Sequence, residues 1–174
     1  MKPIRWIAAA TAGMTLALGG CAVPSPGVAA QVGNVRVTES KVDQVNAAFA
    51  KVMGGSPAET RDRVLAVLVQ GEIVAEIAAR KQILLTSAQR EQIIATDPIM
   101  LALARDPIAR ELSEDTADLR VVVGKLGVEP LLAEAGQLSI LINPRYGTWL
   151  PDQLNVTGGG GSLSKPFSVP TPAS

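Results

Sequence analysis

The spacing of apolar positions predicts a mainly helical protein with a small sheet. Between residues 40 and 52 apolar side chains recur at steps of three and four, as on one face of an amphipathic helix. Over residues 57–81 they cover most of the helix circumference and leave only a thin polar stripe. The stripe consists of Glu72, Glu76 and Arg80. A helix that is apolar on most sides packs in the middle of a domain, so we expect residues 57–81 to form the central helix.

Capping signals divide the following stretch into shorter helices. A Ser, Thr or Asp is typical of a helix start when a Pro follows it directly or when a Gln stands three residues after it. The helices expected from these signals and from apolar spacing span residues 87–95, 98–104, 107–126 and 129–135.

Three short segments alternate between apolar and polar residues, as strands do. Residues 28–32 and 35–37 flank Gly33-Asn34, and a two-residue step of this kind is typical of a tight hairpin. Val32 should then face Val35. Residues 138–142 form a third alternating segment whose only available partner is this hairpin. We therefore expect an N-terminal hairpin and a C-terminal strand to join in one three-stranded sheet.

The first residues have the pattern of an export signal. Lys2 and Arg5 precede an apolar run over residues 6–18, which is shorter than the roughly 20 residues that a membrane-spanning helix needs. Leu18-Gly19-Gly20-Cys21 closes this run and resembles the bacterial lipobox, in which the chain is cut before the cysteine and the thiol is acylated. The alternative is an ordinary secretory signal that is cut a few residues later.

These patterns predict the organisation of the whole chain. We expect a signal peptide over residues 1–20, a lipidated tether over 21–27, a helical domain over 28–151 and a disordered Gly/Ser/Pro tail over 152–174. The protein would be held on the extracytoplasmic face of the cell membrane by acylated Cys21.

Composition excludes several classes of function. The chain has no His, which excludes Ser-His-Asp and Cys-His catalytic sites and His-based zinc sites. Removal of the signal takes away two of the 16 basic residues and none of the 16 acidic ones, so no general attraction to nucleic acid remains. Glu72 and Glu76 are spaced like an acid–base pair, but Glu76 with Arg80 is more simply a surface ion pair. We expect no enzyme activity, no cofactor and no metal.

The order of elements resembles the SurA N-terminal family. Val32-Gly33-Asn34-Val35-Arg36-Val37-Thr38-Glu39-Ser40-Lys41-Val42-Asp43 is similar to the opening turn, strand and helix start of that family, and residues 63–80 are similar to its long helix. Asn143-Pro144-Arg145-Tyr146-Gly147-Thr148-Trp149 resembles the closing strand of lipoproteins that carry this module alone. The resemblance implies a chaperone module that holds unfolded secreted chains. Too few residues follow Gly127 for the parvulin-type isomerase domain that often accompanies it.

Five side chains are candidates for a peptide-binding surface, because flexible Met and large apolar groups suit sequence-tolerant contacts. They are Met53, Ile99, Met100, Leu103 and Trp149. Core packing is the alternative for each of them, and the stronger one for Ile99 and Leu103. The expected function is chaperone-like binding of unfolded or partly folded exported polypeptides. The alternatives are an adaptor that docks one envelope protein and a carrier of lipid or another small ligand.

Overall fold

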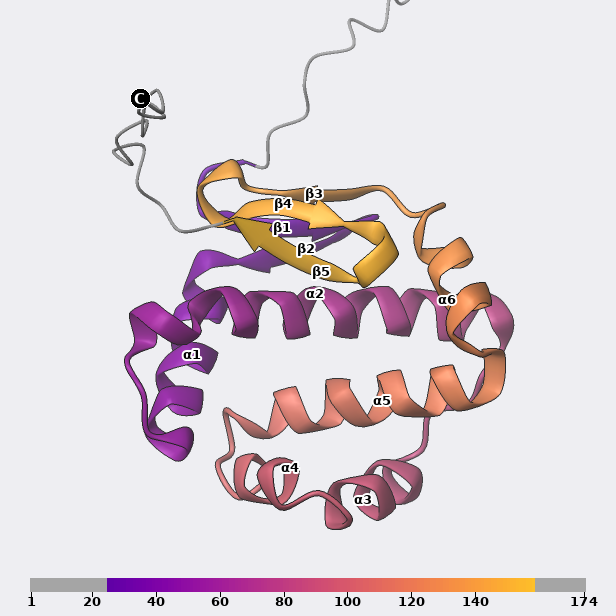
Figure 1. The fold of residues 1–174 in the computed structure, drawn as a ribbon, viewed down its shortest axis with the longest axis horizontal. Helices are drawn as coiled ribbons and strands as arrows, with labels where there is room; N and C mark the ends of the chain where they lie inside the picture. Colours follow the sequence, from indigo (N-terminus) through magenta and orange to yellow (C-terminus); the bar gives the residue numbers. More distant parts are fainter. Residues whose placement is uncertain (1–24, 159–174) are drawn as a thin grey trace, which may run out of the picture.

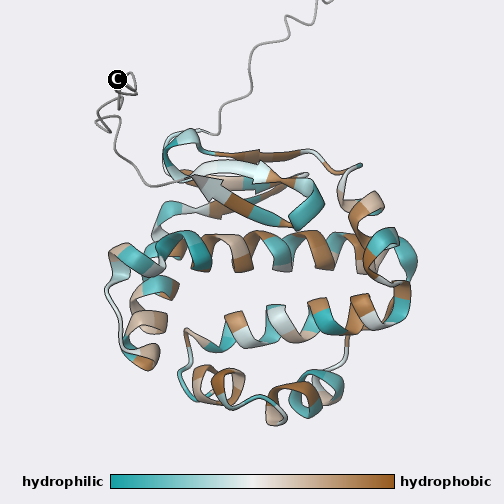
Figure 2. Ribbon diagram, in the orientation of Figure 1, coloured by the Kyte–Doolittle hydropathy of each residue, from teal (hydrophilic) through white to brown (hydrophobic). Residues whose placement is uncertain are grey.

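Helix α2 (Pro57–Lys81) runs through the middle of the computed structural model, which describes residues 25–158 (Figure 1). Strands β1 (Val28–Val32) and β5 (Asn155–Gly158) pack against one side of α2, and helix α5 (Arg110–Leu126) packs against the other. The α2 side chains of Leu65, Ile73 and Ile77 have no contact with solvent. The expectation that residues 57–81 form the central helix is therefore confirmed. Figure 2 shows apolar residues along α2 and the neighbouring strands, where the core lies.

The ends of α2 are fixed by local chemistry. The Ser56 hydroxyl accepts a hydrogen bond from the Ala58 backbone N–H, and the Glu59 carboxylate accepts one from the Ser56 N–H at 3.3 Å. This reciprocal cap satisfies backbone donors that a helix start leaves without partners. At the other end Gln82 adopts a left-handed backbone conformation, which ends the helix.

The remaining helices follow the capping signals closely. Thr38, Thr86 and Asp97 each accept a backbone N–H at the start of the next helix. These helices and the short one after α5 are α1 (Glu39–Met53), α3 (Ser87–Ala95), α4 (Pro98–Leu103) and α6 (Val128–Ala135). Helices α3 and α4 pack against α5 on the side away from α2 and the sheets (Figure 1).

Helix α5 begins three residues later than expected. The Asp106 carboxylate accepts the N–H groups of Ile108 and Ala109 and so holds a separate turn before the helix. The proline after Asp106 therefore belongs to this turn and does not start the helix.

The three-stranded sheet has the expected composition and register. Strand β1 (Val28–Val32) lies between β2 (Val35–Thr38) and β3 (Ile140–Ile142), and all pairings are antiparallel. Val32 is opposite Val35, as the hairpin pattern predicts. Gly33 has a φ of 54°, a left-handed conformation that this tight turn requires and glycine adopts without strain.

A second sheet corrects the expected end of the domain. After the 3₁₀ turn η1 (Pro144–Tyr146), strand β4 (Gly147–Leu150) pairs with β5 (Asn155–Gly158) through the turn η2 (Pro151–Gln153). Residues 152–158 are thus part of the fold, and their assignment to a disordered tail is wrong. Leu154 and Val156 are buried, and Gln70 of α2 donates a hydrogen bond to the Leu154 carbonyl at 2.6 Å.

A polar contact also joins this region to the helices. Arg61 of α2 donates a hydrogen bond to the Tyr146 hydroxyl at 2.8 Å and forms an ion pair with Asp43 of α1 at 2.7 Å. Because Tyr146 is buried, its hydroxyl needs such a partner.

The expected signal peptide, Cys21 and the tail from residue 159 lie outside the described residues. The end of the tether is bonded to the domain, since Val28 N–H donates to the Ser25 carbonyl at 3.0 Å and Glu39 N–H to the Gly27 carbonyl at 2.9 Å. Among residues 25–158, no helix combines the length and apolar character needed to cross a bilayer.

The place of residues 152–158 in the fold can be tested by truncating one buried side chain. Leu154→Ala should lower the free energy of unfolding by about 2 kcal/mol, because it leaves a cavity in the main hydrophobic core. Thr148→Ala, on the exposed side of β4, is the matched control and should cause little change. Urea unfolding followed by circular dichroism measures both. Equal stability of the Leu154 variant and the unaltered protein would contradict the assignment of residues 152–158 to the fold.

Candidate functional site: an apolar pocket between α1, α2, α4 and α5

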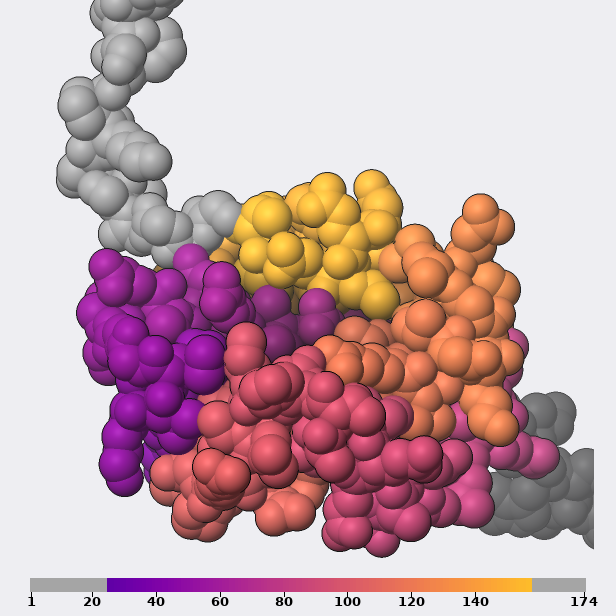
Figure 3. Space-filling model, turned by 60° about the horizontal axis from the view of Figure 1, so that its bottom comes forward, coloured from indigo at the N-terminus to yellow at the C-terminus, as the bar shows by residue number. Residues whose placement is uncertain are grey.

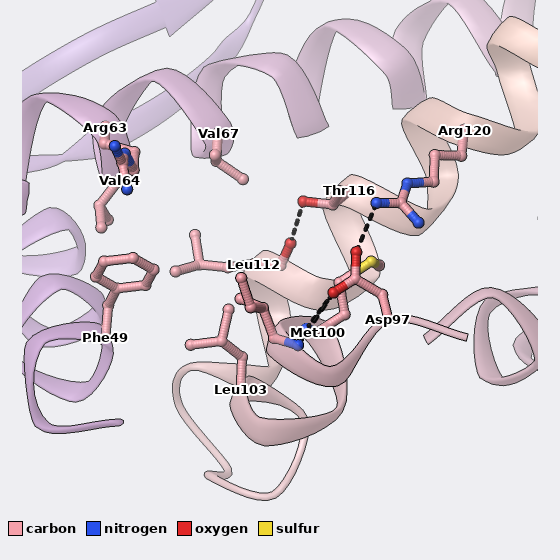
Figure 4. Close-up of a pocket in the computed structure, with 11 residues that line it drawn as sticks. Phe49, Arg63, Val64, Val67, Asp97, Met100, Leu103, Leu112, Thr116 and Arg120 are labelled. Atoms are coloured by element: carbon pink, nitrogen blue, oxygen red, sulfur yellow. Dashed lines mark hydrogen bonds and ion pairs between the residues drawn. The ribbon is translucent and has the colours of Figure 1, made fainter. Parts of the chain in front are cut away.

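A cavity of about 190 Å³ opens where the short helix α4 meets α1, α2 and α5 (Figure 4). Its walls come from all four helices. The lining residues are Phe49, Arg63, Val64, Val67, Asp97, Ile99, Met100, Leu103, Leu112, Thr116 and Arg120. Most of these side chains are apolar, so the cavity favours an apolar group over a charged one.

The floor of the pocket is held rigidly by the core. Phe49 of α1 points toward Leu103 of α4 and Leu112 of α5, and all three side chains are buried (Figure 4). The Ser113 hydroxyl donates a hydrogen bond to the Met100 carbonyl at 2.7 Å and so fixes α4 on α5. The pocket is therefore formed before any ligand binds.

One side of the rim is closed by an ion pair. The Asp97 carboxylate caps α4 through the N–H groups of Ile99 and Met100, and it binds the Arg120 guanidinium at 2.8 Å. The hydrogen bond from Arg120, together with these backbone donors, lowers the pKa of Asp97 below its usual value. Asp97 is thus ionised at neutral pH and its charge is balanced within the rim.

Three of the five predicted peptide-binding residues meet at this pocket. Ile99 lies at the mouth with 54% of its surface exposed, so its interpretation as a core residue is wrong. Met100 and Leu103 are only 4% and 5% exposed and contribute to the walls. They offer a ligand an apolar surface without leaving the core.

The other two predicted residues lie elsewhere. Met53 is half-exposed at the end of α1, one turn after Phe49, and does not line the pocket. Trp149 is opposite Val156 in the second sheet and packs against the main core, with its indole N–H buried and without a hydrogen-bond partner among the described residues.

Sequence reasoning did not find several residues of the pocket. Phe49, Val64 and Leu112 carry the same spacing signal as any other core residue, so nothing marks them as lining a cavity. Arg63 offered no signal of its own either, because it directly follows Arg61 and Asp62 and so continues the charged first turns of α2.

A second polar cluster lies between α1, α2 and α5. Lys41 forms an ion pair with Glu111, and the carboxylates of Glu72 and Asp115 are close enough to raise the pKa of the Lys41 amine. Burial, reinforced by the negative charges of Glu111 and Glu72, raises the pKa of Asp115 to about 8. Asp115 lies directly against Gly71, where a Cβ atom would come within 2.4 Å of the carboxyl carbon. Glycine at this position thus admits the carboxyl group between α2 and α5.

These groups do not assemble a recognisable catalytic or metal site. Glu76 forms the expected ion pair with Arg80 at 2.8 Å, whereas Glu72 belongs to the Lys41 cluster. No group of three or more carboxylate or thiolate side chains within residues 25–158 is arranged to hold a metal ion. The apolar pocket is the feature of this part of the chain best suited to binding.

No protein-family model, curated protein or solved structure matches the chain.

The buried carboxyl group predicts a pH dependence of stability. The pKa of Asp115 is about 8 in the fold against 3.8 in its ordinary state, so the folded protein holds a proton that the unfolded chain releases. Stability should therefore fall as pH rises from about 4 to about 8, by at most ~1.4 kcal/mol per pH unit for this group. Asp115→Asn should remove this fall and stabilise the protein at neutral pH.

Urea unfolding at pH ~5 and pH ~8 measures the effect. The gain from Asp115→Asn should be larger at the higher pH, whereas Asp152→Asn, the same change at an exposed position, should show no such trend. A gain that does not change with pH would contradict the raised pKa.

Proposed function

We propose that this protein is a lipid-anchored, non-enzymatic extracytoplasmic protein. It binds unfolded or partly folded exported polypeptides through the apolar pocket between α1, α2, α4 and α5. The observation that supports this function is an exposed apolar side chain, Ile99, at the mouth of an apolar cavity. Exposed apolar groups beside a preformed cavity favour apolar side chains of another chain as ligands. Binding would be weak, because only a small area is buried.

The size of the pocket favours a side chain over a lipid. A protein cavity of roughly 150 Å³ is known to hold one benzene molecule. The cavity of about 190 Å³ therefore suits one Phe or Leu side chain, and it is too small for an acyl chain. This argues against a lipid carrier.

The position of the pocket also suits a protein ligand. If Cys21 is acylated, the four residues to Ser25 can span at most about 14 Å, which keeps the β1 side of the domain near the membrane. Helix α4 packs against the side of α5 that faces away from α2 and the sheets (Figure 1). Helix α4 would then lie on the side of the domain away from the lipid, where polypeptides in the extracytoplasmic space can reach it.

The resemblance of residues 32–43 and 63–80 to the SurA N-terminal family supports the same proposal, since modules of that family hold unfolded chains. A specific adaptor remains the second candidate, because a pocket for one side chain also suits one fixed partner. Cross-linking from the pocket in intact cells separates the two: many clients give a smear, and an adaptor gives one band.

The role of the pocket mouth can be tested with a matched pair of variants. Ile99→Ser should weaken the suppression of client aggregation several-fold, because it removes the apolar group that a client meets first. Leu84→Ser is the control: Leu84 is 74% exposed but lies on the loop after α2, away from the pocket. Light scattering of an aggregating client, with a chain of residues 22–174 in excess, measures both.

Two outcomes of this assay would contradict the proposal. Unchanged scattering with the unaltered chain at every excess would exclude holding activity. Equal losses in the Ile99 and Leu84 variants would show that general surface hydrophobicity, and not the pocket, is responsible. A thermal unfolding curve for each variant checks that both are folded.

The proposed anchor gives a separate prediction. In cells, Cys21→Ser should move the protein out of the membrane fraction, because acyl chains contribute about 0.8 kcal/mol per buried CH₂ and the substitution removes their attachment point. Mass spectrometry of the membrane-bound protein should show an acylated N-terminal cysteine. An unmodified thiol, or a mature chain that begins after Cys21, would contradict lipid anchoring.

A further inference from the structure

Two cations line the pocket, and of the two only Arg63 forms no ion pair with a carboxylate among the described residues. Arg120, the other cation, binds Asp97. Glu59 lies one turn before Arg63, where a helical ion pair would form, but its carboxylate caps the Ser56 N–H. No hydrogen bond or ion pair within residues 25–158 involves the Arg63 guanidinium, and its side chain is exposed. The pocket therefore has an excess positive charge at its α2 side.

Arg63 also connects the pocket with a second recess. Arg63 and Val67 line both the apolar pocket and a polar recess of about 370 Å³ beside β5. Figure 3 shows part of α2 in a hollow between the yellow β4–β5 hairpin and the salmon residues of α4 and α5. The two depressions thus adjoin at Arg63 and Val67, and we call them together the groove; it is apolar at α4 and polar at β5.

We infer that this groove binds an extended peptide segment in which an apolar anchor residue is followed closely by an acidic residue. The inference rests on the proposed function and specifies its ligand. The anchor side chain fills the cavity below Ile99, and the carboxylate binds the Arg63 guanidinium. The chain then continues along the recess beside β5.

Charge and shape select this ligand. Guanidinium groups bind carboxylates through paired hydrogen bonds, and beside an apolar surface such a contact is less screened by water. Asp62 lines the recess beyond Arg63, so a second acidic residue there would be repelled and a polar or basic one is favoured. A fatty acid shares the apolar body and the carboxylate, but the cavity accepts only a short part of its chain.

The test compares short labelled peptides that differ at one position. Each contains a single Phe among Ser and Gly residues, with Glu, Gln or Lys two positions after the Phe. Fluorescence anisotropy with a chain of residues 22–174 gives the affinities; this chain retains every described residue. We expect the Glu peptide to bind about fivefold more tightly than the Gln peptide, and the Lys peptide to bind most weakly.

Arg63→Gln should abolish the difference in affinity between the Glu and Gln peptides. Arg36→Gln is the matched control, because Arg36 is exposed on β2 and remote from the groove. Added salt should weaken binding of the Glu peptide more than that of the Gln peptide. The conservative variant Arg63→Lys should keep part of the preference, since it keeps the charge.

The outcomes separate this inference from the proposed function. Equal affinity for the Glu and Gln peptides, with binding still lost in Ile99→Ser, would overturn the acidic preference and leave the peptide-binding function standing. If no peptide binds, both fail. Laurate is tested as a competitor of the Glu peptide. If laurate binds saturably and displaces the Glu peptide more strongly than the Gln peptide does, the choice of a peptide as ligand is overturned.

Discussion

The structure depends on the burial of α2 on two opposite sides. Ile73, Val74 and Ile77 are completely enclosed, and α2 contacts both the sheets and α5. Each such side chain contributes roughly 1.5–3 kcal/mol when removed from water. Because neither the sheets nor α5 can cover α2 alone, the two layers stabilise each other through the same helix. The N-terminal hairpin lies on α2, and strand β3, more than a hundred residues later, extends the same sheet by pairing with β1.

The pocket follows from how the outer layer closes over this core. Helix α4 has only six residues and is fixed to α5 by the hydrogen bond from Ser113 to Met100. It is too short to fill the space between Phe49 of α1 and Val67 of α2, and a cavity remains. Its two inward side chains, Met100 and Leu103, are three positions apart, which turns Ile99 outward. An element that completes the fold therefore also presents an apolar group to solvent, and the proposed binding function uses this group.

Much of the fold could be predicted from local signals. Capping residues and apolar spacing located α1, α2 and α3, and the Gly33-Asn34 step set the hairpin register. Strand β5 could not be predicted, because its Asn-Val-Thr-Gly sequence precedes a glycine run and its order comes from its pairing with β4 and its contacts with α2. The pocket was found only in part, through Ile99, Met100 and Leu103. Its remaining walls come from three other helices, and a spacing pattern within one helix does not reveal what another helix places opposite it.

The central claim is that the groove between α2 and α4 receives apolar segments of other chains. The most direct measurement is a methyl NMR titration of the labelled protein with a permanently unfolded polypeptide. The account predicts shifts concentrated at the methyl groups of Ile99, Met100 and Val67, with Leu84 and Val128 unchanged although they are also exposed. Shifts at Leu84 and Val128 without any at the groove, or no shifts at saturating polypeptide, would contradict it.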